Sequence, residues 1–186
     1  MKLEGLKVVY LVGPEFEDLE FWVPVMRLRE EGARVTIAGQ KSGEDYQGKN
    51  GLTATADTSW DDIDPKWYDA VCIPGGWAPD KLRRYESVKR LVKTIYDQQK
   101  TVGMICHAGL VGISAGIVSG HDATGSEGIK DDLINAGAKW RDESAFRSGC
   151  IVWGRVVSDI PNYCRELVKA LEEQKARLIP THTTTG

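Results

Sequence analysis

Several features that assign a protein to a class at once are scarce in this sequence. Its four cysteines form no Cys-x-x-Cys pair, and its three histidines do not stand at zinc-ligand spacings. Lysine plus arginine number 24 against 27 aspartates and glutamates, a formal net charge of −3. This balance provides no basic surface for a phosphate backbone. We therefore expect no metal site and no nucleic-acid partner.

Long apolar runs are also missing. No segment approaches the roughly 20 apolar residues that a membrane-spanning helix needs. The first five residues lead straight into a strand-like segment, without the layout of a signal peptide. We expect a cytoplasmic protein without a membrane partner, in which Cys72, Cys106, Cys150 and Cys164 are free thiols.

Two signatures of known enzyme classes are absent. No Gly-x-Gly-x-x-Gly follows the first predicted strand, and the acidic residues of the segment 13–17 would repel phosphate. A nucleotide-binding protein is therefore disfavoured. A glutamine amidotransferase would need a late catalytic histidine, but no histidine lies between His121 and His182.

The sequence does contain the alternation of strand and helix patterns that is typical of an α/β fold. The 186 residues, 41% of them apolar, suit one domain, which we place at residues 1–175 with a flexible tail at 176–186. Helical patterns separate the predicted strands and a late hairpin is expected at 145–153. The segment 44–59 is expected to be an irregular hairpin excursion without chemistry. This order predicts a mostly parallel sheet with helices on both faces. The predicted strands are Lys7–Val12, Arg34–Ala38, Ala70–Ile73 and Thr101–Ile105.

Functional residues of such sheets gather at the carboxyl ends of the strands. There Cys106 directly follows a predicted buried strand and precedes a predicted helix, the arrangement of a nucleophile elbow. A helix N-terminus favours the thiolate, so we expect a lowered pKa for Cys106 alone among the four thiols. His107 is adjacent, but neighbouring side chains on a tight turn generally point apart, and no conventional Cys-His pair is required.

Two further segments end at the same edge of the sheet. Gly75 and Gly76 follow the strand next to that of Cys106, where glycine allows backbone N–H groups to approach a ligand. Glu17 and Glu20 stand at the start of the first helix, either as ordinary helix-start acids or close to the thiol. An acid beside a thiolate should be buried and protonated, so that it donates a hydrogen bond to the sulfur.

In these positions the sequence resembles the PfpI/ThiJ family, a superfamily that includes intracellular proteases and the human parkinsonism-linked deglycase. The resemblance runs from about residue 7 to residue 171. The matching motifs are Glu17-Asp18-Leu19-Glu20, Pro74-Gly75-Gly76, Ile105-Cys106-His107, the segment 128–137 and Arg155.

The resemblance implies a flavodoxin-like three-layer sandwich that acts without a cofactor and assembles as a homodimer or hexamer. It implies that Cys106 is the nucleophile, His107 its catalytic neighbour and Glu20 the acid bound to the thiol. Glu17 matches a second acid. The backbone N–H groups of Gly76 and His107 match an oxyanion hole. Metal-dependent chemistry is not implied.

Some positions depart from the family pattern. Asp80 stands where PfpI proteases have a glutamate, supplied across a subunit interface to orient the histidine, and it is shorter by one methylene. Trp77 replaces an arginine or asparagine and is placed to stack over the site entrance. We expect Trp77, Gly75 and Arg155 to contact substrate, although the proline that often follows the arginine is missing.

Three functions remain open. A thiol-dependent glyoxalase or deglycase would act on a small aldehyde or glycated substrate and needs only a small pocket. A PfpI-type cysteine peptidase needs a groove for an extended chain, for which the sequence gives no sign. A redox or stress-response protein would use Cys106 as an oxidisable thiol without catalysis. We favour the first.

Overall fold

A seven-stranded sheet forms the centre of the computed structural model, which describes residues 1–178. Its order is β10-β11-β7-β6-β1-β2-β5, and every neighbouring pair is parallel except β10 with β11. The strands are β1 (Lys7–Leu11), β2 (Arg34–Gly39), β5 (Thr58–Ser59), β6 (Ala70–Ile73), β7 (Thr101–Ile105), β10 (Ala145–Ser148) and β11 (Ile151–Gly154).

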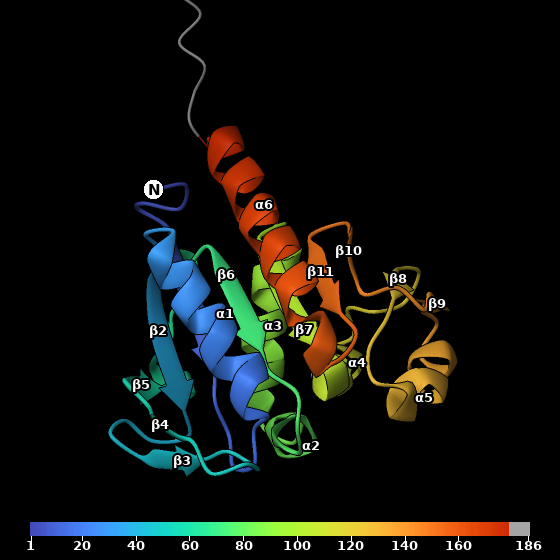
Figure 1. Cartoon of the computed structure of the whole chain (residues 1–186), viewed down its shortest axis with the longest axis horizontal. Coiled ribbons are helices and arrows are strands. Elements are labelled where there is room, and N and C mark those ends of the chain that lie inside the picture. The colour runs from blue at the N-terminus through green and yellow to red at the C-terminus, as the bar shows by residue number, and fades with distance from the viewer. Residues whose placement is uncertain (179–186) are drawn as a thin grey trace, which may run out of the picture.

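Helices cover both faces of this sheet, as Figure 1 shows, with α1 and α6 toward the viewer and α3 behind. The protein is thus a flavodoxin-type α/β sandwich, which confirms the predicted fold class. The helices are α1 (Asp18–Glu30), α2 (Ala78–Leu82), α3 (Glu86–Asp97), α4 (Gly109–Ser114), α5 (Lys130–Asn135) and α6 (Ile160–Leu178). Two small sheets pair β3 (Asp45–Gln47) with β4 (Thr53–Thr55) and β8 (Asp122–Ala123) with β9 (Lys139–Trp140).

The four predicted strands are present, and their buried apolar residues explain why. All residues of β6 and β7 are buried, as expected for central parallel strands covered on both sides. The structure adds α2, β8 and β9, whose few residues carry no periodic signal. The domain boundary expected after residue 175 falls inside α6, which continues to Leu178. The rest of the expected tail lies outside the described residues.

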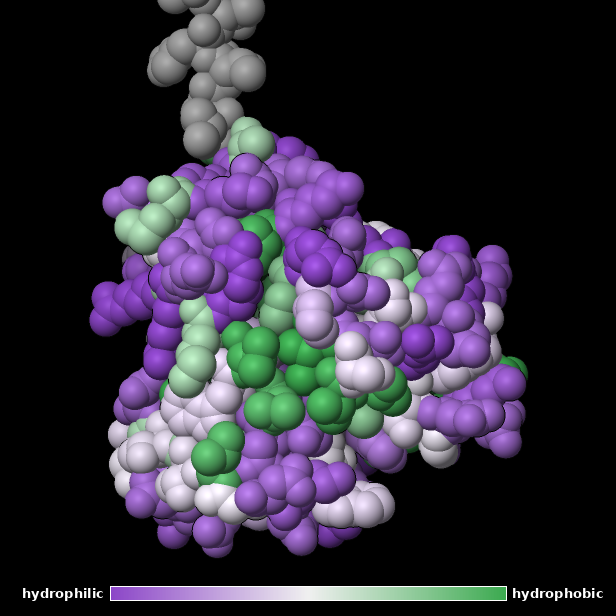
Figure 2. Space-filling view, viewed as in Figure 1, coloured by the Kyte–Doolittle hydropathy of each residue, from purple (hydrophilic) through white to green (hydrophobic). Residues whose placement is uncertain are grey.

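The apolar residues of helix α1 do not all face the core. Leu19, Val23 and Met26 stand at helical spacing in the sequence, but these three side chains are exposed. The core instead receives Phe21, which is fully buried, and others of the helix. Figure 2 shows the resulting apolar area over α1 and the adjoining end of α6. The helix is apolar on more than one face, so spacing alone could not select the inner one.

None of the helices within residues 1–178 is both long enough and apolar enough to cross a bilayer. The chemistry-bearing segments converge at one end of the sheet. Strands β1, β6 and β7 are parallel neighbours, so the segments that leave their carboxyl ends lie side by side.

Candidate active site

Cys106 occupies a sharp turn between β7 and α4. Its φ of +60° lies in the left-handed region that residues with a Cβ rarely adopt. A 3-10 turn, Cys106–Ala108, joins the strand to the helix. The backbone N–H of Ser126 donates to the Cys106 carbonyl at 3.2 Å and helps to hold the turn. The predicted sharp turn from strand to helix at Cys106 is confirmed, and such backbone strain is typical of functional sites.

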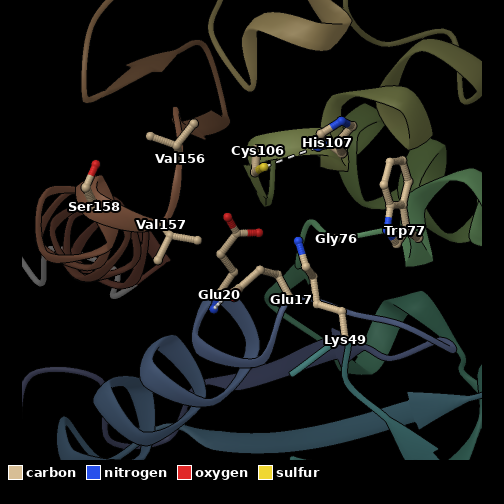
Figure 3. A pocket seen from close by; sticks show the side chains of 10 residues that line it. All are labelled: Glu17, Glu20, Lys49, Gly76, Trp77, Cys106, His107, Val156, Val157 and Ser158. Carbon is tan, nitrogen blue, oxygen red and sulfur yellow. Dashed lines mark hydrogen bonds between the residues drawn. The ribbon is translucent and has the colours of Figure 1, made fainter. Parts of the chain in front are cut away.

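A cavity of about 340 Å³ opens beside this thiol (Figure 3). It brings together six of the residues singled out from the sequence. These are Glu17, Glu20, Gly76, Trp77, Cys106 and His107, joined by Lys49, Val156, Val157 and Ser158. The size suits a small molecule better than an extended peptide.

Glu20 is fully buried in the first turn of α1, and its carboxyl group points toward the thiol (Figure 3). Its Oε2 accepts a hydrogen bond from the Gly75 N–H at 2.8 Å, whereas Oε1 has no partner among the described residues. Burial, reinforced by the negative charge of Glu17, raises the pKa of Glu20 to about 7. This shift is in the direction of the prediction that the acid retains a proton near neutral pH.

Gly75 packs against Cys106 and Glu20 and does not line the cavity. A Cβ at this position would lie 2.7 Å from the Cβ of Cys106 and would collide with the Glu20 carboxyl. The glycine thus allows the nucleophile and the acid to approach each other. The expectation that Gly75 contacts substrate is not supported by this placement, because its N–H is already used by Glu20.

His107 is closer to the nucleophile than expected. Its Nδ1 lies 3.3 Å from the Cys106 Sγ, although the two residues are adjacent in the sequence. Partial burial, followed by the charge of Lys49, lowers the pKa of His107 below its usual 6.5. The imidazole is therefore mostly neutral at pH 7 and able to accept the thiol proton.

The pKa of Cys106 itself is opposite to the expectation. Burial, with the charge of Glu20 next, raises it to about 12, while the backbone N–H groups of His107 and Gly76 lower it only in part. The predicted lowering was wrong because burial and the neighbouring Glu20 outweigh the backbone N–H groups at the elbow. Formation of the thiolate therefore requires a proton acceptor.

The segment after β6 brings a backbone donor and an aromatic ring to the cavity. Gly76 has a φ of +76°, and its backbone N–H partly offsets the raised pKa of the Cys106 thiol. Trp77 is 57% exposed, and its ring centroid lies 5.8 Å from that of His107. The placement of Trp77 at the cavity wall agrees with its expected position over the site entrance.

Two residues expected in the site lie elsewhere in the described chain. Asp80 is exposed on α2 and forms an ion pair with Arg84, one turn later. Arg155 lies outside the cavity and is held by two carboxylates, Asp142 and Asp159, at 2.8 Å each. These ion pairs raise the pKa of Arg155. The expectation that Arg155 contacts substrate is contradicted by this placement, since its guanidinium is occupied by the chain itself.

The cavity also contains residues that sequence reasoning missed. Lys49 belongs to the segment 44–59, where no chemistry was expected, and Val156, Val157 and Ser158 precede α6. The tight Gly48-Lys49-Asn50-Gly51 turn was the available signal for Lys49. Within residues 1–178, no cluster of three or more histidine, cysteine or acidic side chains is arranged to bind a metal ion.

Comparison with known proteins identifies the family of the chain. The sequence profile described as the DJ-1/PfpI family matches residues 6–170. "Deglycase PH1704" of Pyrococcus horikoshii is 39% identical over 167 residues, which cover 90% of this chain and all of the relative. "Deglycase PfpI" of Pyrococcus furiosus is 37% identical over the same shares. "Putative cysteine protease YraA" of Bacillus subtilis is 35% identical, covering 89% of this chain and 98% of the relative.

Solved structures show the same fold. The DJ-1/ThiJ/PfpI-like and ferritin-like two-domain protein of Anabaena variabilis matches with a TM-score of 0.88 and 33% identity, over 97% of this chain and 52% of that one. Drosophila melanogaster DJ-1beta matches with a TM-score of 0.83 at 22% identity, over 94% and 98% of the two chains. On the strength of the profile and the full-length relatives, the chain belongs to the DJ-1/PfpI family.

Proposed function

We propose that this protein is a cysteine-dependent enzyme that acts on small reactive carbonyl compounds, as a deglycase or a glyoxalase that converts methylglyoxal to lactate without a cofactor. One observation carries the proposal. A small cavity brings a nucleophile at an elbow, a neutral histidine and a buried acid of raised pKa to the same point. Full-length relatives named deglycases support it. We place the activity in the cytoplasm, where thiols stay reduced.

The first step uses the Cys106–His107 contact. As the Cys106 sulfur attacks the aldehyde carbon, a C–S bond forms and the thiol proton passes to Nδ1 of His107, 3.3 Å away. The carbonyl π electrons move to oxygen, and we assign the stabilisation of that negative charge to the backbone N–H groups of Gly76 and His107, which also favour the thiolate. Protonation of the oxygen by Glu20 gives a hemithioacetal.

The remaining steps need no external oxidant. A base removes the hydrogen of the former aldehyde carbon as a proton, and a proton is returned to the neighbouring ketone carbon. The first carbon is thereby oxidised to a thioester and the second is reduced to an alcohol. Water then cleaves the C–S bond, which releases the hydroxy acid and restores the thiol. Both proton transfers fall to His107 and Glu20, the groups that face the sulfur (Figure 3).

The direct test is lactate formation from methylglyoxal by the purified protein without added cofactor, measured beside release of a free amine from a methylglyoxal-glycated peptide. Turnover of either substrate supports the proposal. If Cys106 is intact and neither product accumulates above the uncatalysed rate, the proposal fails.

Peptide hydrolysis is a second candidate, because a histidine within reach of the nucleophile is also what a cysteine peptidase needs. One full-length relative carries a protease name. This function would require an acid to orient His107, and the family resemblance assigns that role to Asp80 of a neighbouring subunit. Asp80 is exposed on α2 and available to another chain, although it is paired with Arg84 in its own.

The substitution Asp80→Ala separates the two candidates. We expect methylglyoxal turnover to stay within about tenfold of the wild type, a loss of at most ~1.4 kcal/mol in transition-state stabilisation. The reason is that Asp80 does not line the cavity. A much larger loss, together with Cys106-dependent cleavage of a peptide and its recovery in Asp80→Glu, would favour the peptidase.

We also propose that the protein is a homo-oligomer, a dimer or hexamer, in which a second copy covers the apolar face of α1. Leu19, Val23 and Met26 are exposed there side by side at helical spacing.

Light scattering coupled to size exclusion should give a mass of at least two chains. We expect Val23→Asp to shift this mass toward one chain, because a charge at the centre of the apolar face disfavours its burial. A monomeric wild type at micromolar concentration would contradict the proposal.

A further inference from the structure

The tip of the β3–β4 hairpin is fixed to the start of α1 by a buried carboxylate. Asp18 is only 2% exposed, and its two oxygens accept hydrogen bonds from the backbone N–H groups of Asn50 and Leu52 at 2.8 and 2.7 Å. Gly48 packs directly on this carboxylate, since a Cβ there would lie 2.5 Å from the Asp18 Oδ1. A buried charge devoted entirely to one turn holds that turn in place.

Two more bonds tie the same turn to the catalytic segment. The Lys49 N–H donates to the Phe16 carbonyl at 3.0 Å, and the side chain of Asn50 donates to Glu17 Oε1 at 3.2 Å. The other oxygen of Glu17 accepts from the Glu20 N–H at 2.8 Å. The hairpin tip is therefore connected to residues 16–18, which directly precede the turn of α1 that carries Glu20.

This docking places the Lys49 side chain at the cavity, where its ammonium group points toward the space between Glu20 and His107 (Figure 3). Lys49 is the only lysine or arginine among the described residues that line this cavity. Within residues 1–178, no carboxylate oxygen lies within the 4.0 Å of a salt bridge to it. The ammonium is thus available to a bound molecule.

The charges around the cavity leave room for an added anion. Among the described residues that line the cavity, the acidic ones are Glu17 and Glu20, and both oxygens of Glu17 are already hydrogen-bonded within the chain. Glu20 shares the cavity but is buried and partly protonated at neutral pH. His107 is neutral there and adds no charge. A ligand carboxylate near Lys49 would form an ion pair for which the described residues provide no partner.

We propose that Lys49 forms an anion-binding subsite opposite Cys106, so that the preferred substrates are small aldehydes that carry a carboxylate at their other end. The substrate class rests on the proposed function, whereas the subsite does not. Lys49 acts here as a specificity residue that binds the remote end of the substrate. It takes no part in bond making or breaking.

The subsite is tested first with two alkylating agents that differ in charge. Iodoacetate and iodoacetamide are of similar size, and each forms a bond from Sγ to carbon as iodide leaves with its bonding electrons. The rate of labelling of Cys106 by each is measured at pH 9 by peptide mapping. The ratio of the two rates cancels any change in the thiolate fraction, so it reports only on the preference for an anion.

We expect this ratio to fall about tenfold in Lys49→Gln, to stay near the wild-type value in Lys49→Arg, and to decline with ionic strength in the wild type. Lys41→Gln is the matched control, an exposed lysine near the start of the same excursion that does not line the cavity. An unchanged ratio in Lys49→Gln, or an equal fall in Lys41→Gln, would overturn the subsite.

The substrate class is tested with 4,5-dioxopentanoate and its neutral counterpart 2-oxopentanal. We expect Lys49→Gln to raise KM for the anionic compound about tenfold while kcat for the neutral compound changes less than threefold. Equal KM changes for both compounds would overturn the substrate class. If methylglyoxal is turned over but 4,5-dioxopentanoate is not, the substrate class fails while the proposed function stands. If no aldehyde is turned over, the proposed function fails, and the alkylation ratio still decides the subsite.

Discussion

Replacing Cys106 with serine is expected to lower the turnover of methylglyoxal by at least about a thousandfold, equivalent to ~4 kcal/mol of transition-state stabilisation. The thiol lies at the elbow with a neutral imidazole 3.3 Å from its sulfur. A serine hydroxyl in the same place is a much weaker acid, and the histidine cannot produce a comparable concentration of the nucleophile. The measurement is kcat/KM from lactate formation.

The control for this variant is Cys150→Ser. Cys150 is also partly exposed, but it lies near the β10–β11 turn and lines a different cavity. We expect this variant to retain activity within about threefold. Loss of activity in both variants would indicate a general effect on the fold, and retention of activity in Cys106→Ser would remove the nucleophile from the proposed mechanism. Far-UV circular dichroism and a melting temperature establish that each variant is folded.

Glu20→Gln is expected to stabilise the protein at alkaline pH while impairing catalysis. The pKa of Glu20 rises from 4.5 to about 7 on folding, so the folded state binds the proton more tightly than the unfolded state. The favourable contribution of the protonated acid is fully present below about pH 4.5 and is lost as the pH rises through about 7. The full loss is about 3 kcal/mol. Glutamine occupies the same volume without this charge.

The unfolding free energy in urea at pH 5 and pH 8 checks this sign. We expect wild type to lose stability between the two values by more than Glu20→Gln does. A pH dependence that is the same in both proteins would contradict the raised pKa. For catalysis we expect at least a hundredfold loss in Glu20→Gln and Glu20→Leu, since neither side chain transfers a proton.

The pKa of Cys106 distinguishes these two Glu20 variants from each other. The charge of Glu20 contributes to the raised thiol pKa, so its removal should lower that pKa. Glutamine adds a hydrogen-bond donor toward the sulfur, whereas leucine leaves only the desolvation. We therefore expect the thiol pKa to be lower in Glu20→Gln than in Glu20→Leu, measured from the pH dependence of alkylation. Equal values in both variants and the wild type would exclude Glu20 from contact with the thiol.

The motifs at the strand ends could be predicted from the sequence, because the conformation of each depends on residues that are neighbours along the chain. The apolar run 101–105 followed by Cys106 predicts both the buried strand and the elbow, and both are present. The positions of Gly75 and Gly76 follow from the carboxyl-end rule for parallel strands. The inner face of α1 was not readable, because apolar side chains lie on both sides of that helix.

Periodicity and the residue types at turns were sufficient to predict the α/β class, the strands and Cys106 as the candidate nucleophile. The electrostatics of the site could be obtained only from the folded structure. The raised pKa of Cys106 comes from burial and from Glu20, which is 86 positions away in the chain. Likewise, the docking of the hairpin tip on Asp18 brings Lys49 to the cavity, whereas the ion pairs of Arg155 keep its guanidinium away. Desolvation and ion pairing depend on distances between remote segments, which local spacing does not encode.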